Sequence, residues 1–315
     1  MIIDTNVQWE NMQRPLRGIL TPLATPLASS QQAEPSLDAA GLERLLEHVI
    51  SGSVHGIFLL GSTGEFPSLG REMRQEIIRR TCTQVNRRVP VLVGITDTAI
   101  SETLRLADTA VEAGADALVL AAPYYFQHSQ EDLFRYLELI TGKLSLPLFL
   151  YNIPHLTKTS FEPETVRRAA DLPGVVGLKD STGDFVYLEK TVELMRDRPE
   201  FTILIGPEEM LLECMKRGAI GGVCGGSNLN PKLFVELYNA IARGDWQHAE
   251  ALQERVNQMG RALYHTGFPG GSYQRGIKAA LALAGLCGPE PAPPFAPFSQ
   301  EEYALVEKGY RSLKI

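Results

Sequence analysis

Cysteine is scarce in this chain of 315 residues, which has four cysteines spread along its length. No two of them form a CxxC pair, and none shows a histidine spacing typical of a zinc site. These observations argue against a disulfide framework and against a structural metal. The sequence instead predicts reduced thiols packed in a core, at Cys82, Cys214, Cys224 and Cys287.

Long apolar runs are also missing. No segment approaches the roughly 20 apolar residues of a membrane span, and the start MIIDTNVQWENMQRP lacks the apolar core of a signal peptide. The net charge of −7 argues against a nucleic-acid partner and against binding to an anionic membrane. We therefore expect a cytoplasmic protein without nucleic-acid or membrane partners.

Short apolar runs of four to eight residues recur along most of the chain. They are rich in Val, Ile, Leu and Phe, as buried parallel strands should be. The predicted strands cover 17–23, 55–60, 89–95, 115–122, 147–152, 174–180, 201–206 and 219–226.

Amphipathic segments separate these runs. Leu42, Leu45, Leu46, Val49 and Ile50 fall on one face of a helix. A second helix is predicted to begin after the N-cap Ser129, with Leu133, Phe134, Leu137 and Ile140 on one side.

About eight strand-then-helix units fit a closed (β/α)₈ barrel better than an open doubly wound sheet. Neither GxGxxG nor GxxxxGK[ST] occurs, so the usual nucleotide-binding signals of the open sheet are missing. We predict a TIM barrel over 1–230, with its first 15 residues or so as an N-terminal arm. A helical extension is predicted over 231–315, with a Pro-rich connector before its last helix.

Unusual residues gather where the predicted strands end, which is where barrel enzymes place their chemistry. If the barrel is correct, all of them line one rim. The groups are GSTGE at 61–65, PYY at 123–125, YNIP at 151–154, Lys179, GPEE at 206–209, and Ser227 with Asn228.

Lys179 stands out because it ends the apolar run GVVGLKDS. It could extend its amine into water at the rim or pair with Asp180. A lysine held among apolar strands is instead favoured in its neutral, nucleophilic form. Such an amine attacks a ketone to give a protonated Schiff base, an electron sink for C–C cleavage.

The GSTGE segment couples small glycines to two hydroxyls before a helical segment. Gly61 lets a ligand approach the backbone, and amides near a helix start suit a carboxylate. A simple strand-to-helix turn explains the same residues equally well. We interpret Glu65 as a first-turn capping carboxylate. Tyr151 and His155 each have a structural alternative, since buried tyrosines and lone histidines often serve only packing.

Taken together, GSTGE, PYY, YNIP and GLKDS resemble the dihydrodipicolinate synthase/N-acetylneuraminate lyase family of class I, pyruvate-dependent aldolases. The motifs occur in the family's order over residues 16 to 290. The resemblance implies a (β/α)₈ barrel with a C-terminal helical extension, no metal and no organic cofactor. It also implies a homotetramer, built as a dimer of dimers.

The resemblance also implies roles for individual residues. Lys179 would form the Schiff base with the 2-oxo group, and Tyr151 would shuttle the proton at the reacting C–C bond. Ser62 and Thr63 would hold the pyruvate carboxylate. Tyr125 would be lent across the dimer interface to complete the proton relay of the neighbouring site.

Substrate choice depends on the residues after YNIP. The lysine-biosynthesis branch has an arginine two residues after the proline, where this chain has Leu156. Leucine cannot replace the bidentate arginine, so dihydrodipicolinate synthesis is disfavoured. YNIPHLTK is closer to the lyase form, although Lys158 replaces an expected glycine.

The lyase form places an acidic pair after the seventh strand to bind sugar hydroxyls. Glu208 and Glu209 occupy these positions, and Gly206 and Gly225 could offer backbone groups. Carboxylates accept hydrogen bonds from hydroxyls but repel phosphate. An acidic helix N-terminus would explain the two glutamates equally well.

The leading hypothesis is reversible cleavage of a hydroxylated 2-oxo acid to pyruvate and an aldehyde. The substrate would be a 2-keto-3-deoxy sugar acid or a compound like N-acetylneuraminate. A Schiff-base dehydratase of a 2-oxo sugar acid and a non-catalytic barrel that binds oxo acids are the alternatives. The presence of Lys179 and Tyr151 argues against the non-catalytic barrel, because a protein that only binds oxo acids needs neither group.

Overall fold

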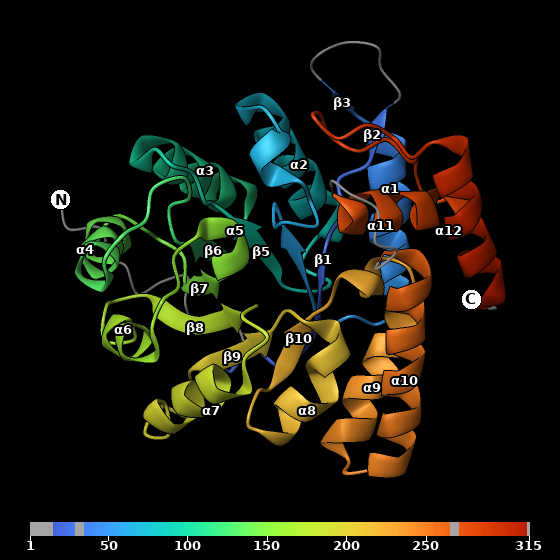
Figure 1. The fold of residues 1–315 in the computed structure, drawn as a ribbon. Helices are drawn as coiled ribbons and strands as arrows, with labels where there is room; N and C mark the ends of the chain where they lie inside the picture. Colours follow the sequence, from blue (N-terminus) through green and yellow to red (C-terminus); the bar gives the residue numbers. More distant parts are fainter. Residues whose placement is uncertain (1–14, 29–34, 265–270, 314–315) are drawn as a thin grey trace. The chain divides into compact units, whose positions relative to one another are not determined.

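The computed structural model describes residues 15–28, 35–264 and 271–313 (Figure 1). Eight parallel strands close into a barrel in the order β1-β10-β9-β8-β7-β6-β5-β4. The predicted TIM barrel is therefore confirmed. Its strands are β1 (Gly18–Pro22), β4 (Gly56–Leu59), β5 (Val91–Gly94), β6 (Ala117–Ala121), β7 (Leu148–Asn152), β8 (Val175–Asp180), β9 (Thr202–Ile205) and β10 (Gly221–Val223).

Each barrel strand lies inside one of the eight predicted apolar runs, and every strand residue is buried. Strands of a closed parallel barrel are covered by side chains on both faces, which is why they appear as continuous apolar runs. The hairpin of β2 (Leu27–Ala28) and β3 (Ser36–Leu37) was not predicted. Two-residue strands are too short to show a period in the sequence.

The structure divides into two compact units, and the first comprises residues 90–223 with the chain before Ile19. It contains strands β5 to β10, and helices α6 and α7 contact each other outside β8 and β9 (Figure 1). The helices of this unit are α3 (Ile100–Ala113), α4 (Gln130–Thr141), α5 (Pro154–Thr157), α6 (Pro163–Ala169), α7 (Phe185–Leu194) and α8 (Leu211–Lys216).

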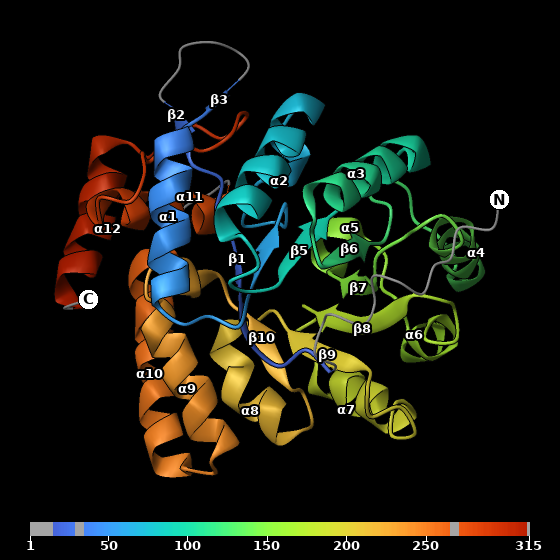
Figure 2. The same ribbon diagram turned by 180° about the vertical axis from the view of Figure 1, so that it is seen from behind.

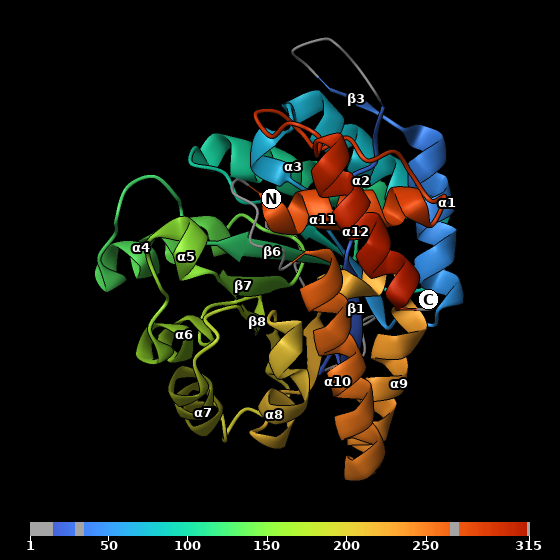
Figure 3. The same ribbon diagram turned by 45° about the vertical axis from the view of Figure 1, so that its right-hand side comes forward.

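The second unit comprises residues 19–89 and 224–315. Helices α1 and α2 lie side by side (Figure 2), and α11 crosses α12 (Figure 3). Its helices are α1 (Ala39–Ser51), α2 (Arg71–Val85), α9 (Pro231–Ala242), α10 (Trp246–Leu263), α11 (Ser272–Leu283) and α12 (Gln300–Ser312). The predicted helical extension after residue 230 is thus present as helices, while the division at 230 stays a prediction. The predicted N-terminal arm falls almost entirely outside the described residues.

Local sequence signals explain how the helices begin and which face they bury. In α1 the predicted face is buried at Leu42, Leu45, Leu46 and Val49. In α4 the predicted N-cap Ser129 accepts from the Asp132 amide, and the Asp132 side chain bonds back to complete a capping box. Such a cap satisfies amides that the helix cannot, and contributes about 1 kcal/mol.

All four cysteines are free and buried, as predicted for core thiols. Within the described ranges, no helix combines the length and the apolar character that crossing a membrane requires. The same residues hold no cluster of three or more His, Cys, Asp or Glu side chains suited to a metal ion.

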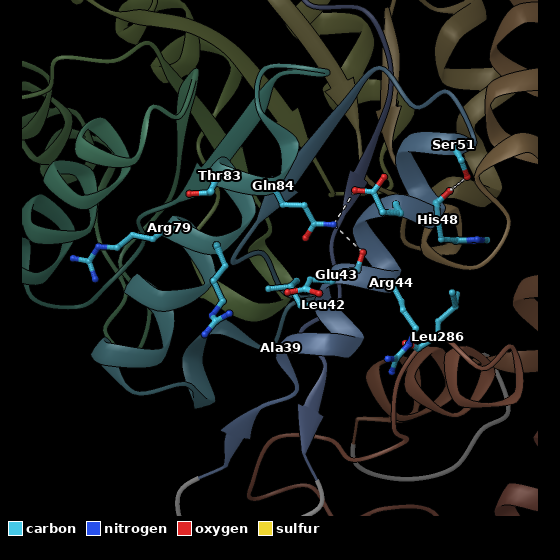
Figure 4. A pocket seen from close by; sticks show the side chains of 12 residues that line it. Ala39, Leu42, Glu43, Arg44, His48, Ser51, Arg79, Thr83, Gln84 and Leu286 are labelled. Atoms are coloured by element: carbon cyan, nitrogen blue, oxygen red, sulfur yellow. Dashed lines mark hydrogen bonds between the residues drawn. The ribbon is translucent and has the colours of Figure 1, made fainter.

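A solvent groove runs between α1 and α2 on the outside of the second unit (Figure 4). Gln84 bridges the two helices by donating to the Glu43 carbonyl and the Glu47 carboxylate. Arg88 forms a bidentate pair with the same Glu47 and holds the pKa of that carboxyl at about 2. The groove contains none of the residues predicted for the site.

Candidate active site

Strand β8 carries Lys179 as its penultimate residue. The register of the sheet places Lys179 opposite Tyr151 on β7 and opposite Leu204 on β9. Residues opposite each other in a parallel sheet direct their side chains to the same face. Lys179, Tyr151 and Leu204 therefore share one face, and each is at most 5% exposed.

The amine of Lys179 lies over the ring of Tyr151, with 4.0 Å between Nζ and the ring centroid. An amine at this distance packs against the face of the aromatic ring. Two residues predicted from the sequence to act together are thus neighbours. Their proximity follows from the register of β7 and β8 rather than from a flexible loop.

Asp180 follows Lys179 but is directed to the opposite face, because successive side chains of a strand alternate. Its carboxylate accepts from the amide and the hydroxyl of Thr182 at 3.0 Å each. Burial raises the pKa of Asp180 to about 6. The predicted alternative of an Asp180–Lys179 pair is therefore wrong, because the pleat separates the two side chains.

Asn152 fixes the loop that follows Tyr151. Its side chain is fully buried and accepts from the Phe161 amide at 3.0 Å, while Nδ2 donates to the Ser160 hydroxyl at 3.1 Å. Tyr187 on α7 donates to the Phe161 carbonyl at 2.8 Å. These contacts hold the end of β7, and hence Tyr151, in place.

The segment after β9 holds the predicted acidic pair. Glu208 is 5% exposed, whereas Glu209 is exposed, at the start of a 3₁₀ helix. Gly206 donates to the Asp180 carbonyl at 2.7 Å, which joins this segment to the end of β8. A Cβ at Gly206 would lie 1.9 Å from the Ser181 hydroxyl, so a larger residue would displace that hydroxyl.

Tyr125 is 74% exposed and contacts Phe126, which is 69% exposed, edge to face. Its backbone has φ of 90°, a conformation that L residues rarely adopt. Strained, exposed aromatic residues are typical of functional or contact surfaces rather than of packing. In the described part of this single chain, Tyr125 does not join the pair of Lys179 and Tyr151.

Three residues that follow the YNIP segment are exposed. His155, Leu156 and Lys158 all lie on the surface of the first unit, with Leu156 at 53% exposure. Partial burial lowers the pKa of His155. Leu156 presents an apolar side chain where the related synthases are expected to have an arginine.

The GSTGE loop belongs to the second unit and forms a tight turn. The amides of Gly64 and Glu65 donate to the carbonyls of Gly61 and Ser62 at 3.1 Å each. A Cβ at Gly61 would lie 2.6 Å from the ring of Phe58, so glycine is required for this approach. The loop leads into a short 3₁₀ helix, and α2 begins only at Arg71. The helical segment predicted after the loop is thus a short 3₁₀ helix, separate from α2.

Tyr273 of α11 connects two predicted substrate-binding residues. Its hydroxyl lies 3.4 Å from the Thr63 hydroxyl, and it would lie 1.6 Å from a Cβ built on Gly225. Thr63 is 4% exposed and Gly225 is buried. Thr63, Gly225 and Tyr273 thus converge at one place in the second unit.

Glu65 lies at the N-cap position of the 3₁₀ helix, but its side chain makes no capping hydrogen bond, which corrects the prediction for this residue. Its carboxylate faces Lys278 of α11, with 2.9 Å between Oε1 and Nζ, and accepts from the Ala292 amide at 2.7 Å. Both side chains are at most 2% exposed. The sequence signal for a capping acid was misleading because a buried cation in the distant helix competes for the carboxylate.

The chain matches the model of the dihydrodipicolinate synthetase family over residues 15–312. The chain belongs to this family. Members are pyruvate-dependent class I aldolases and lyases that use a Schiff-base lysine and no cofactor. The chain is accordingly a class I pyruvate-dependent aldolase, and the resemblance predicted from GSTGE, PYY, YNIP and GLKDS is confirmed.

Solved structures of similar chains agree with this membership. Dihydrodipicolinate synthase from Bacteroides thetaiotaomicron is 45% identical, with a TM-score of 0.91 over 96% of this chain and 100% of that one. YagE from Escherichia coli K12, solved in complex with pyruvate, is 31% identical, with a TM-score of 0.87 over 95% and 99%.

Relatives known by sequence carry two different names. The 4-hydroxy-tetrahydrodipicolinate synthase of Thermodesulfovibrio yellowstonii is 32% identical over 94% of this chain and 98% of its own. YagE of Escherichia coli (strain K12), named "Putative 2-dehydro-3-deoxy-D-gluconate aldolase", is 32% identical over 96% and 99%. One name is that of a synthase and the other that of an aldolase, so the two relatives are named for different reactions.

Three residues beside the predicted site were not singled out from the sequence. Ser181 lies against Gly206, Tyr273 lies against Thr63, and Lys278 pairs with Glu65. Ser181 could have been suspected, since it follows the strand of Lys179 directly. Tyr273 and Lys278 belong to a helix far along the chain with no motif of its own.

Proposed function

We propose that this aldolase cleaves a 2-keto-3-deoxy sugar acid reversibly to pyruvate and an aldehyde, with Lys179 as the Schiff-base residue. The observation that carries the proposal is the buried Lys179 amine lying 4.0 Å from the centroid of the Tyr151 ring. A buried amine beside a phenol supplies both the nucleophile and the proton carrier that Schiff-base cleavage needs.

The reaction follows from these two groups. The Lys179 nitrogen adds to the C2 carbonyl of the 2-oxo acid, and the carbonyl oxygen leaves as water. The protonated imine accepts the electron pair of the C3–C4 bond as that bond breaks, and Tyr151 takes the proton of the C4 hydroxyl. The aldehyde leaves, C3 of the enamine regains a proton, and water releases pyruvate and the free amine.

Ser62 and Thr63 are proposed to bind the carboxylate of the 2-oxo acid. They follow β4 in the same parallel barrel whose strands β7 and β8 carry Tyr151 and Lys179. The GSTGE turn supports the assignment because Gly61 permits close backbone approach and the two hydroxyls can donate to a carboxylate.

The sugar acid is favoured by two features. Leu156 cannot bind the second carboxylate that a synthase of dihydrodipicolinate type must hold. Glu208 and Glu209 offer oxygens that accept from sugar hydroxyls, with backbone groups at Gly206 and Gly225. The second candidate is 4-hydroxy-tetrahydrodipicolinate synthesis, which the names of several relatives favour.

A substrate panel tests the choice. The enzyme is incubated with 2-keto-3-deoxygluconate, N-acetylneuraminate and related acids, and pyruvate release is measured. In parallel, pyruvate consumption is measured with aspartate semialdehyde. We expect the fastest pyruvate release from a 2-keto-3-deoxy sugar acid. Faster turnover of aspartate semialdehyde would overturn the proposed substrate, and sugar-acid consumption without an aldehyde would favour the dehydratase.

Assembly is part of the proposal. We propose a homotetramer, built as a dimer of dimers, in which Tyr125 completes the proton relay of a neighbouring site. The exposure of Tyr125 and Phe126 supports this, because two large aromatic side chains in water are costly for a lone chain. The cytoplasm stays the predicted compartment.

A further inference from the structure

The buried ion pair between Glu65 and Lys278 connects the GSTGE loop to α11. Lys278 also donates to the Glu290 carbonyl at 2.8 Å, and Glu65 accepts from the Ala292 amide at 2.7 Å. Removing two charges from water is costly before their attraction is counted, so such a pair is weak evidence for stability. A buried ion pair can instead serve to fix one particular conformation of the chain.

The backbone conformation of Glu65 indicates which part of the loop the ion pair fixes. Its φ of 57° lies in the left-handed region, which is unfavourable for any residue with a Cβ. Such a conformation persists where surrounding contacts enforce it. Three contacts enforce it at Glu65. The side chain binds Lys278 and the Ala292 amide, and the backbone amide of Glu65 donates a hydrogen bond to the Ser62 carbonyl.

Two further side chains of α11 reach the same loop. Gln274 donates to the Ser62 carbonyl at 3.5 Å, and the Tyr273 hydroxyl lies 3.4 Å from the Thr63 hydroxyl. Gln274 and Lys278 are four residues apart, so they occupy one face of the helix. Side chains of α11 thus contact Ser62, Thr63 and Glu65 of the loop.

We propose that Lys278 is a positioning residue for the carboxylate-binding loop. Through Glu65, it holds the left-handed turn that fixes the directions of the Ser62 and Thr63 hydroxyls. The C-terminal helical extension is then required for recognition of the 2-oxo acid. This inference rests on the proposed role of Ser62 and Thr63 as the carboxylate site.

The test replaces Lys278 by methionine, which keeps the length of the side chain and removes its charge. Arg275→Met is the control, because Arg275 is another cation of α11 with little exposure, and it pairs with Glu302 of α12. The measurement is the pyruvate concentration that gives half-maximal borohydride trapping. We expect this half-saturation concentration to be about tenfold higher in Lys278→Met than in Arg275→Met. Both variants should still be trapped fully at saturating pyruvate.

Pyruvamide separates positioning from general loss of structure. It has the ketone but lacks the carboxylate, so Lys278→Met should leave its half-saturation concentration close to that of Arg275→Met. Glu65→Gln is the second variant, because the amide oxygen can still accept from Ala292. Glu65→Gln should also raise the half-saturation concentration of pyruvate and not that of pyruvamide. If Lys278→Met does not fold, Glu65→Gln alone tests the positioning role.

The outcomes are distinct. Equal half-saturation concentrations of pyruvate in Lys278→Met and Arg275→Met would overturn the positioning role. An equal rise of the half-saturation concentrations of pyruvate and pyruvamide in Lys278→Met would overturn it too. Both results would leave the proposed function intact. If the unaltered enzyme shows no adduct at Lys179, the proposed function itself fails. If the unaltered enzyme takes pyruvate and pyruvamide with equal half-saturation, only the carboxylate assignment of Ser62 and Thr63 fails.

Discussion

At the scale of single residues, the pleat of β8 separates two adjacent ionisable groups into different environments. Lys179 lies beside Tyr151, while Asp180 on the opposite face is held by Thr182. Burial disfavours the charged carboxylate and raises its pKa from 3.8 to about 6. The side chain next to the proposed nucleophile thus contributes to pH dependence of folding without forming its ion pair.

This difference predicts how Asp180 affects stability. Between pH 4 and 6, roughly, the folded protein binds a proton at Asp180 that the unfolded chain releases, so stability falls as pH rises. Asp180→Asn removes this dependence. The free energy of unfolding of the natural protein should fall relative to that of the variant across this range, by at most about 3 kcal/mol.

Urea unfolding of both proteins at several pH values between 4 and 7 provides the measurement. Glu47→Gln is a suitable control of opposite sign, because Arg88 holds the pKa of Glu47 at about 2, below its usual 4.5, so this carboxyl makes stability rise with pH up to about pH 5. Parallel pH profiles for the natural protein and Asp180→Asn would show that Asp180 is not the group responsible.

At the scale of elements, strand β8 must approach β7 closely to bring Lys179 to Tyr151. Gly177 lies opposite Phe149, two residues before the lysine and on the same face. A Cβ there would lie 2.6 Å from the Phe149 ring and 2.7 Å from the Thr202 carbonyl oxygen. The glycine of GLKDS is therefore explained by packing between strands.

Gly177→Ala should destabilise the protein by about 1–3 kcal/mol, the usual cost of overpacking a core. It should also reduce turnover, because β8 must shift. Gly142→Ala is the matched control, since Gly142 has an ordinary right-handed backbone and its nearest contact is at 3.8 Å. Equal unfolding midpoints in urea for the two variants would contradict the packing argument.

The elements were predictable to different degrees. All eight barrel strands could be predicted because burial on both faces leaves an uninterrupted apolar run. The partner of Glu65 could not, because Lys278 lies in a helix whose sequence shows no sign of which loop it meets. The rule that favours acids in a first helical turn gave the wrong role for Glu65, since tertiary contacts override it.

The site shows the same division. Lys179 and Tyr151 could be paired from sequence because both end neighbouring strands of a parallel barrel, where register brings strand ends together. Tyr273 and its contacts with Thr63 and Gly225 could not be predicted. They depend on how α11 packs, which no local pattern specifies.

At the scale of the whole molecule, the proposed sharing of Tyr125 predicts complementation between two inactive variants. Lys179→Arg lacks the nucleophile, and Tyr125→Phe lacks the hydroxyl lent to the neighbour. In a hybrid dimer, one site combines an intact Lys179 with an intact Tyr125 from the other chain. Mixing the variants after dissociation and reassembly should therefore restore activity.

The control mixes each variant with itself through the same dissociation and reassembly, which should restore nothing. Native mass spectrometry establishes that hybrids have formed, because the two variant chains differ in mass. If confirmed hybrids are no more active than the average of the parents, Tyr125 acts within its own chain or plays no part in the proton relay.

The central claim is that Lys179 bonds covalently to the 2-oxo acid, and chemical trapping tests it most directly. The enzyme is incubated with pyruvate and borohydride, and the modified peptide is mapped by mass spectrometry, with Lys278→Met carried alongside. We predict one reduced pyruvate adduct on Lys179, present in both proteins at saturating pyruvate and absent from Lys179→Arg. An unmodified Lys179, or an adduct on another lysine, would contradict the account.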